Sequence, residues 1–182
     1  AGRGLYAYDP KTGKELWYVR HRGWSVAPRP VSGHGLVFAT VDRDRPELWA
    51  IRLNGKGDVT DTHIEWKSIR SMPQRCSPLL VGDLLFVVNR GGIASCLEAK
   101  TGEVVWKERL KGAYSASPIY AEGRIYLFNE EGLTTVIRPT RKLEVIASNV
   151  LARQPFMATP AVDGDAFIMR TGGYLYRVEA QQ

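Results

Sequence analysis

Four segments of this chain begin alike, and this internal repeat constrains the fold more than any other feature of the sequence. Each segment has a shared proline, at Pro30, Pro78, Pro118 and Pro160, so that successive units are 48, 40 and 42 residues apart. A glycine turn and an apolar run follow every one of these prolines, and in the last three units a second glycine turn leads into another β-rich run. Short strands joined by glycine hairpins are typical of all-β folds, and self-similarity near 40 residues is typical of propeller blades.

A recurring phrase of the form AxDxxTGxxxW ends two of the units: it stands over residues 7–17 and recurs over residues 96–106 with Cys96 for the Ala and Glu98 for the Asp. Together with a tryptophan at the equivalent spacing, the residues of this structural blade motif are Asp9, Thr12, Gly13, Trp17, Trp66, Thr101, Gly102 and Trp106. The Thr-Gly pair predicts a tight turn with a glycine at positive φ, and the tryptophan ring is expected to be buried against the next sheet. In the unit that starts near residue 113, Val145 takes the tryptophan position, so we expect smaller side chains to hold that unit.

Four strands per unit predict an all-β fold, a β-propeller built of four-stranded antiparallel blades. Residues 84–88 are apolar throughout, as a strand must be when neighbouring blades cover both of its faces. We predict the end of one blade at residues 1–23, whole blades at 24–72, 73–112 and 113–154, and an incomplete last blade at 155–182. Since both ends supply a third strand, we interpret the chain as the C-terminal half of a ring of seven or eight blades. The alternative is a half-ring that pairs with a second copy.

Composition and charge exclude several classes of protein. No run approaches the roughly 18 apolar residues that a membrane-spanning helix needs, and residues 1–10 contain no secretory signal. The net charge of +6 is spread along the chain as isolated Arg and Lys, which is not the basic stripe expected of a nucleic-acid binder. Two cysteines, Cys76 and Cys96, are too few for a disulfide framework. Blade geometry places them apart, so we predict two free thiols, with Cys96 buried.

The repeats resemble the bacterial pyrroloquinoline-quinone-like (PQQ-like) β-propeller repeat family, of the quinoprotein alcohol dehydrogenase-like superfamily. The AxDxxTGxxxW phrase and the stretch 57–66, which ends in Trp66, carry this resemblance. The same repeat occurs in the periplasmic lipoprotein subunit of the outer-membrane protein assembly machine. The resemblance therefore implies a bacterial protein that acts in the periplasm or elsewhere outside the cytoplasm.

A dehydrogenase of this family binds its quinone on the propeller axis, with a calcium ion, an Asp base and, in many members, two adjacent cysteines. Here the two cysteines are twenty residues apart, and no Asp stands at the start of an innermost strand. The residues that stand there are Trp24, Arg29, Arg75, Tyr114, Ser115, Phe156 and Met157. Arg29 and Arg75 are the candidate cofactor-binding residues, because two guanidinium groups can hold an anionic group such as a quinone carboxylate. The alternative is that these residues frame an empty, water-filled channel.

Other groupings carry weaker signals for chemistry. Asp58, Asp61 and His63 are close enough to share a metal ion, but their spacing matches no calcium loop, so we favour a polar loop and predict no metal site. No nucleophile elbow, zinc-protease motif or phosphate-binding loop is present, and we predict no catalytic residue in this segment.

The sequence therefore favours a non-catalytic propeller scaffold or binding module, whose working surface is the end of the ring where the loops before the shared prolines gather. We expect no cofactor, and as partner either another protein or the missing half of the propeller, with no nucleic acid. The rival interpretation is a fragment of a PQQ-dependent dehydrogenase that binds PQQ with calcium and has its catalytic residues outside this segment. A sensor domain attached to a kinase or hydrolase is a third possibility.

Overall fold

The structure, a computed structural model, describes residues 3–151 and 154–179, and every regular element in them is a β-strand. The first sheet is formed by β1 (Gly4–Tyr8), β2 (Glu15–Arg20) and β6 (Gly57–Asp58). The second sheet is formed by β3 (Val31–Gly33), β4 (Leu36–Val41), β5 (Glu47–Arg52) and β7 (Ile64–Ser68). These two sheets are called blades 1 and 2 below.

Three further sheets follow in chain order as blades 3, 4 and 5. Blade 3 consists of β8 (Leu79–Val81), β9 (Leu84–Val88), β10 (Ile93–Glu98) and β11 (Val104–Arg109). Blade 4 consists of β12 (Ile119–Ala121), β13 (Arg124–Phe128), β14 (Leu133–Ile137) and β15 (Val145–Val150). Blade 5 consists of β16 (Ala161–Asp163), β17 (Ala166–Arg170) and β18 (Leu175–Glu179).

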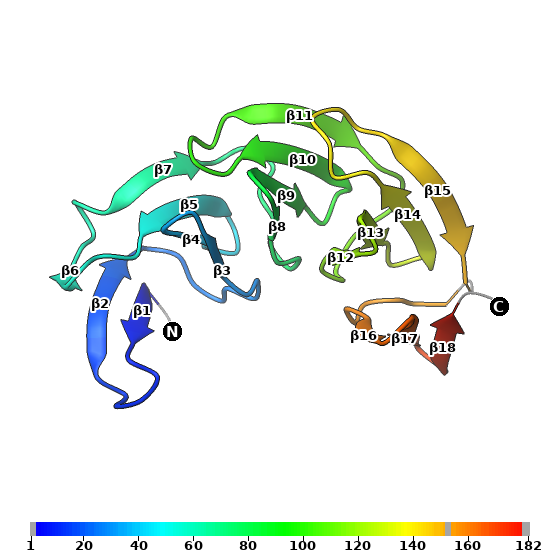
Figure 1. Cartoon of the computed structure of the whole chain (residues 1–182), viewed down its shortest axis with the longest axis horizontal. Coiled ribbons are helices and arrows are strands. Elements are labelled where there is room, and N and C mark those ends of the chain that lie inside the picture. The colour runs from blue at the N-terminus through cyan, green and yellow to red at the C-terminus, as the bar shows by residue number, and fades with distance from the viewer. Residues whose placement is uncertain (1–2, 152–153, 180–182) are drawn as a thin grey trace.

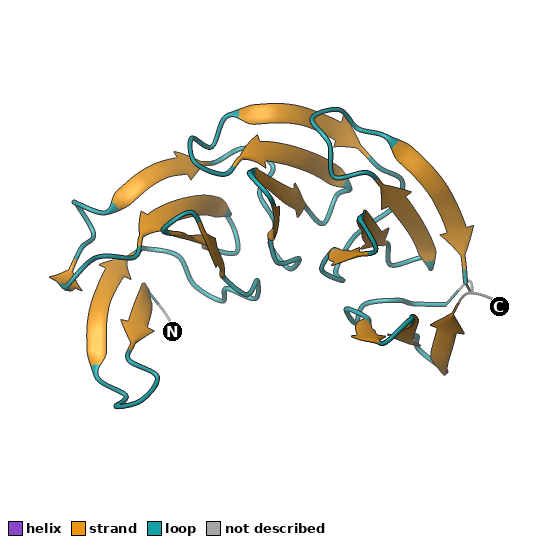
Figure 2. Cartoon of the chain, viewed as in Figure 1, coloured by secondary structure: helices purple, strands orange, loops and turns teal. Residues whose placement is uncertain are grey.

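The predicted fold class is confirmed, because the three whole sheets are four-stranded, antiparallel and ordered as in propeller blades. Figure 1 shows the five blades side by side along an arc, with the short strands β3, β8, β12 and β16 on its inner side and β7, β11 and β15 on its outer side. Figure 2 shows the turns that join successive strands of a blade, and the longer connection between β5 and β7 in blade 2. The predicted blade boundaries lie in loops between the sheets and, like the count of seven or eight blades in a full ring, remain predictions.

Buried side chains hold each pair of neighbouring blades together. One apolar cluster around Trp17, Trp49 and Val59 fills the joint between blades 1 and 2. A second cluster, around Phe38 and Leu97, fills the next joint. Blades therefore cover each other's faces, which explains the uninterrupted apolar stretch in β9.

Strand β6 was not predicted from the sequence. It belongs to the insertion between β5 and β7 of blade 2, yet it pairs in parallel with β2, the outermost strand of blade 1. Val59, which follows it, is only 2% exposed and packs with Trp17. The insertion therefore covers the open edge of blade 1 and ties it to blade 2.

Candidate functional site

On the outer side of the arc, each motif tryptophan joins its blade to the next one. The indole N–H groups donate hydrogen bonds to main-chain carbonyls of the following blade, from Trp17 to Leu53 (3.2 Å), from Trp66 to Ala99 (3.0 Å) and from Trp106 to Thr140 (3.1 Å). Because a buried indole needs a partner for its N–H, each of these bonds fixes the position of one blade against its neighbour.

The Thr-Gly turn supplies the surface on which the tryptophan of the preceding blade packs. Thr101 closes this turn by accepting a bond from a backbone N–H at 3.3 Å, and Gly102 adopts a φ of 75°. A Cβ atom added to Gly102 would lie 2.6 Å from the ring of Trp66. Only glycine satisfies both the positive φ and this close approach.

The residue before each shared proline joins the blades on the inner side of the arc. Its backbone N–H donates to the side-chain hydroxyl of the equivalent residue one blade further on, at 2.9 Å in each case: Arg29 to Ser77, Ser77 to Ser117, and Ser117 to Thr159. These three bonds form a ladder along the inner side of the arc. The ladder was not predicted from the sequence, although the recurrence of Ser or Thr before the shared proline was a signal for it. Arg29 occupies a ladder position without contributing a hydroxyl.

The two candidate cofactor-binding arginines have different surroundings. The guanidinium of Arg75 donates to Ser115 (2.9 Å) and lies 3.6 Å from Glu130, while the Ser115 hydroxyl donates to the same carboxylate at 2.6 Å. Arg75 is therefore engaged by an anion of the protein itself. The side chain of Arg29 is exposed and forms no hydrogen bond or ion pair with the described residues. Ligand binding by the two arginines remains a prediction.

The other residues expected to line the axis are of two kinds. Tyr114 and Phe156 are buried, at 0% and 2% exposure, so the expectation that they line an open channel is wrong. Their large rings pack in the clusters that hold blades 3, 4 and 5 together. Trp24 and Met157 are more than half exposed.

Both cysteines are buried and form no disulfide, as expected from the blade geometry. Cys96 pairs with Phe86 across β9 and β10. Burial raises the pKa of Cys76 and of Cys96 to about 12. Neither thiol therefore carries the thiolate character of a nucleophile or metal ligand near neutral pH.

In the insertion, where the sequence favours a polar loop over a metal site, Asp58 bonds to neighbouring residues of the chain. Asp58 accepts bonds from both the backbone N–H (3.1 Å) and the hydroxyl (2.6 Å) of Thr60, and these bonds lower its pKa. Its other carboxylate oxygen lies 3.4 Å from the guanidinium of Arg20. Within the described ranges, no group of three or more His, Cys, Asp or Glu side chains is arranged to hold a metal ion.

The register of blade 4 corrects the assignment of Val145 to the tryptophan position. Trp106 pairs with Cys96 across blade 3, and the residue in the same position of blade 4 is Ala147, which pairs with Val136. The assignment was wrong because the turn before β15 is one residue longer than the turn before β11.

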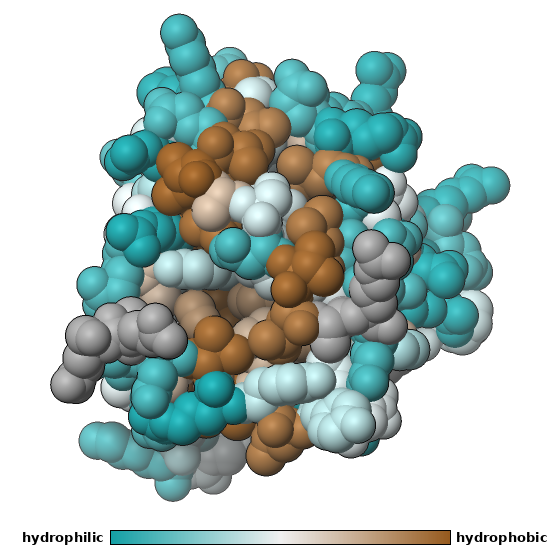
Figure 3. Space-filling model, turned by 90° about the vertical axis from the view of Figure 1, so that its right-hand side faces the viewer, coloured by the Kyte–Doolittle hydropathy of each residue, from teal (hydrophilic) through white to brown (hydrophobic). Residues whose placement is uncertain are grey.

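The joint that lacks this tryptophan contains a cavity. It has a volume of about 830 Å³ and is lined by Phe128 and Tyr126 of blade 4 and by Met169 and Phe167 of blade 5. The rings of Tyr126 and Phe167 meet edge to face, with 4.8 Å between the ring centres. Figure 3 shows apolar side chains around a hollow on the right-hand side of the molecule as drawn in Figure 1. Blades 4 and 5 are thus less tightly filled than the blades joined by tryptophan.

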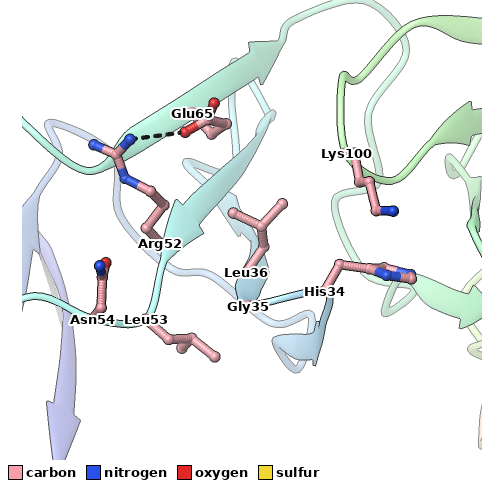
Figure 4. A pocket seen from close by; sticks show the side chains of 8 residues that line it. All are labelled: His34, Gly35, Leu36, Arg52, Leu53, Asn54, Glu65 and Lys100. Carbon is pink, nitrogen blue, oxygen red and sulfur yellow. Dashed lines mark hydrogen bonds and ion pairs between the residues drawn. The ribbon is translucent and has the colours of Figure 1, made fainter.

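A smaller pocket of about 490 Å³ lies at the end of the blades where the β3–β4 hairpin turns (Figure 4). Arg52 and Glu65 on its wall form an ion pair at 3.2 Å. His34, at the hairpin tip, donates to the carbonyl of Gly82 in blade 3 at 2.9 Å. Because partners within the fold satisfy these groups, the pocket presents little free charge to a ligand.

Antiparallel four-stranded blades, joined by tryptophans outside and hydroxyls inside, define a β-propeller of PQQ-like repeats. The family described as outer membrane protein assembly factor BamB matches residues 1–182, and the chain belongs to this family. None of the described segments forms a helix long and apolar enough to cross a membrane.

One relative and two solved structures illustrate how far this likeness reaches. The outer membrane protein assembly factor BamB of Alkalilimnicola ehrlichii is 26% identical over 171 residues, which cover 91% of this chain and 43% of the relative. The crystal structure of BamB from Moraxella catarrhalis matches with a TM-score of 0.77 and 15% identity, covering 98% of this chain and 53% of that one. The β-propeller domain of Cps50 (Swd1) from Myceliophteria thermophila matches with a TM-score of 0.69 and 16% identity, covering 98% and 64%.

The two structural matches show the fold alone, since propellers of this shape serve unrelated functions. The chain spans less than half the length of the curated relative that it matches.

Proposed function

We propose that this chain is part of a non-catalytic propeller that binds other proteins outside the bacterial cytoplasm and takes part in the assembly of outer-membrane proteins. The observation that carries the proposal is the family match along the whole chain, together with the description of the Alkalilimnicola ehrlichii relative as an outer membrane protein assembly factor.

The polar groups at the inner ends of the blades support a scaffold rather than a cofactor site. The Ser and Thr hydroxyls there connect neighbouring blades, because each accepts a bond from a backbone N–H of the preceding blade. Arg75 is likewise engaged by Glu130 and Ser115. These groups stabilise the ring, and breaking their bonds to hold a ligand would cost about 1 kcal/mol or more for each bond.

A deletion strain of the bacterium that carries the protein tests the proposal. We expect the outer membranes of the deletion strain to contain less β-barrel protein than those of the parent, and the intact gene to restore the amount. Unchanged amounts of every outer-membrane β-barrel protein would contradict the assembly role.

Titration with PQQ tests the rival enzymatic interpretation on the purified protein. Quenching of tryptophan fluorescence is followed with and without calcium, and we expect no saturable quenching in either case. Saturable, calcium-dependent quenching that disappears in an Arg29→Ala, Arg75→Ala variant would favour the dehydrogenase.

A further inference from the structure

The topology brings two sets of connections to one end of the blades: the hairpins between second and third strands, and the loops that lead from each blade to the next. Both sets lie at the same end, because the second and the fourth strands of a blade run in the same direction. Backbone hydrogen bonds join the two sets: the N–H of Tyr114 donates to the carbonyl of Arg90 at 3.0 Å, and the N–H of Phe156 donates to the carbonyl of Glu130 at 3.1 Å. We call this surface the loop end, and its segments are 20–30, 42–47, 69–78, 89–92, 109–118, 129–132, 151, 154–160 and 170–174.

The positive charge of the chain is concentrated at the loop end. Its segments hold 11 of the 25 Lys and Arg residues but only 5 of the 19 Asp and Glu residues, so the remaining sequence has 14 of each and is neutral. Ten of these 11 basic residues are arginines. The charge that is dispersed along the sequence is thus gathered in space, because the loops and hairpins that carry most of these arginines lie at the same end of the blades.

Most of these arginines are available to a partner. Those of the hairpins, Arg43, Arg45 and Arg90, are exposed and form no ion pair with any described residue. The same holds for Arg22 and Arg70 in the connecting loops. A guanidinium left free in this way can bind a carboxylate through two parallel hydrogen bonds.

Exposed apolar side chains lie among the arginines. Trp24 is 52% exposed and lies beneath the guanidinium of Arg43, 5.5 Å from it, while its indole N–H donates to Asp44 at 3.1 Å. Ile69 is 67% exposed and borders a pocket of about 420 Å³, which Arg45 also lines. Aromatic, apolar and arginine side chains around a small pocket are the composition of protein-binding hot spots.

The opposite end of the blades lacks such a concentration of unpaired arginines. Its arginines largely pair with carboxylates, as Arg52 does with Glu65 (3.2 Å) and Arg138 with Glu144 (3.2 Å). The excess of unpaired arginine therefore belongs to the loop end and not to the surface as a whole.

We propose that the loop end binds an acidic segment of a partner protein, whose carboxylates pair with the hairpin arginines while an apolar side chain enters the pocket beside Ile69. The inference rests on the proposed binding function. Carboxylates lie among the arginines, with Asp44 between Arg43 and Arg45, and Glu130 and Glu131 in blade 4. This pattern of arginines with carboxylates among them fits a protein segment of mixed charge, whereas a continuous polyphosphate or an anionic membrane would also meet the carboxylates.

Charge reversal on the purified protein tests the proposal. The probe is a fluorescein-labelled peptide of Glu-Glu-Leu repeats, whose binding is followed by fluorescence anisotropy. The test variant is Arg43→Glu, Arg45→Glu, Arg90→Glu. The control variant, Lys11→Glu, Lys14→Glu, Lys142→Glu, changes the net charge equally at exposed positions of the opposite end.

We expect the test variant to bind the peptide at least about tenfold more weakly, the control to bind within about twofold of the wild type, and added salt to weaken binding. The proposal is overturned if the wild type does not bind, or if both variants lose equal affinity. Competition by polyphosphate or phosphatidylglycerol vesicles as effective as that by unlabelled peptide would also overturn it.

Complementation of the deletion strain separates this inference from the proposed function. If the wild type and the control variant restore the outer-membrane proteins and the test variant does not, both are supported. If all three restore them equally, the assembly role stands and the loop-end inference is wrong.

Discussion

Replacing Gly102 by alanine should loosen the joint between blades 2 and 3 specifically. The added Cβ would lie 2.6, 2.7 and 3.1 Å from three ring atoms of Trp66, whereas carbon atoms in contact prefer about 3.5–4.0 Å. The indole has little freedom to move away, because it donates to Ala99 and packs against Phe38, with 5.9 Å between the ring centres.

The magnitude follows from two contributions to the free energy of unfolding. An alanine at φ of 75° costs about 1 kcal/mol, and overpacking against the indole adds about 1–3 kcal/mol. Gly35 is the matched control: its φ is 74°, and nothing lies within 4 Å of an added Cβ. We therefore expect Gly102→Ala to lower the stability by about 1–3 kcal/mol more than Gly35→Ala, a difference in Tm on the order of 5 °C.

Urea and thermal denaturation followed by circular dichroism measure both variants, and a double-mutant cycle identifies the cause. In a Trp66→Leu background the smaller side chain removes the clash, so the cost of Gly102→Ala should fall to that of Gly35→Ala. Equal costs of the two glycine substitutions in the wild type, or an unchanged cost in the Trp66→Leu background, would refute the packing of the tryptophan on the turn.

Three further predictions concern other joints and buried groups. Both cysteines of the native protein should resist iodoacetamide at pH 8, because burial raises the pKa of Cys76 and Cys96 to about 12, and both should react after denaturation. For the same reason the free energy of unfolding should fall above about pH 9, where the thiols of the unfolded chain ionise and those of the folded chain do not. Rapid labelling of the native protein would contradict the burial of the two thiols. Val59→Ala should lower the stability by about 1–2 kcal/mol, because the side chain is buried against blade 1; a change within error would mean that the insertion does not pack there. Ser117→Ala should lower the free energy of unfolding by about 1 kcal/mol, because it removes the hydroxyl that accepts the bond from Ser77 in the inner ladder. Ser148→Ala, at an exposed site, should leave it unchanged, and denaturation curves of the two variants decide whether the ladder contributes to stability.

Some elements of the candidate site were within reach of the sequence, and others were not. The Thr-Gly turn could be predicted at Gly102 because its positive φ is a property of a few neighbouring residues. The burial of Tyr114 and Phe156 could not, since a position near the axis is open or closed according to how neighbouring blades fill it. The error at Val145 has a related cause, because cross-strand pairing rather than spacing along the chain sets which residue replaces the tryptophan.

By itself, the sequence determined the repeat, the short strands, the all-β blades and the family resemblance, because alternation and turn chemistry act over a few residues. Tertiary structure alone decided which groups meet between blades: Ser77 with Ser117, Arg75 with Glu130, and β6 with the edge of blade 1. These partners are 40 to 55 residues apart in the sequence, and the packing of successive blades along the arc brings them together. The same curvature gathers dispersed arginines into one basic surface, which the order of residues along the chain does not reveal.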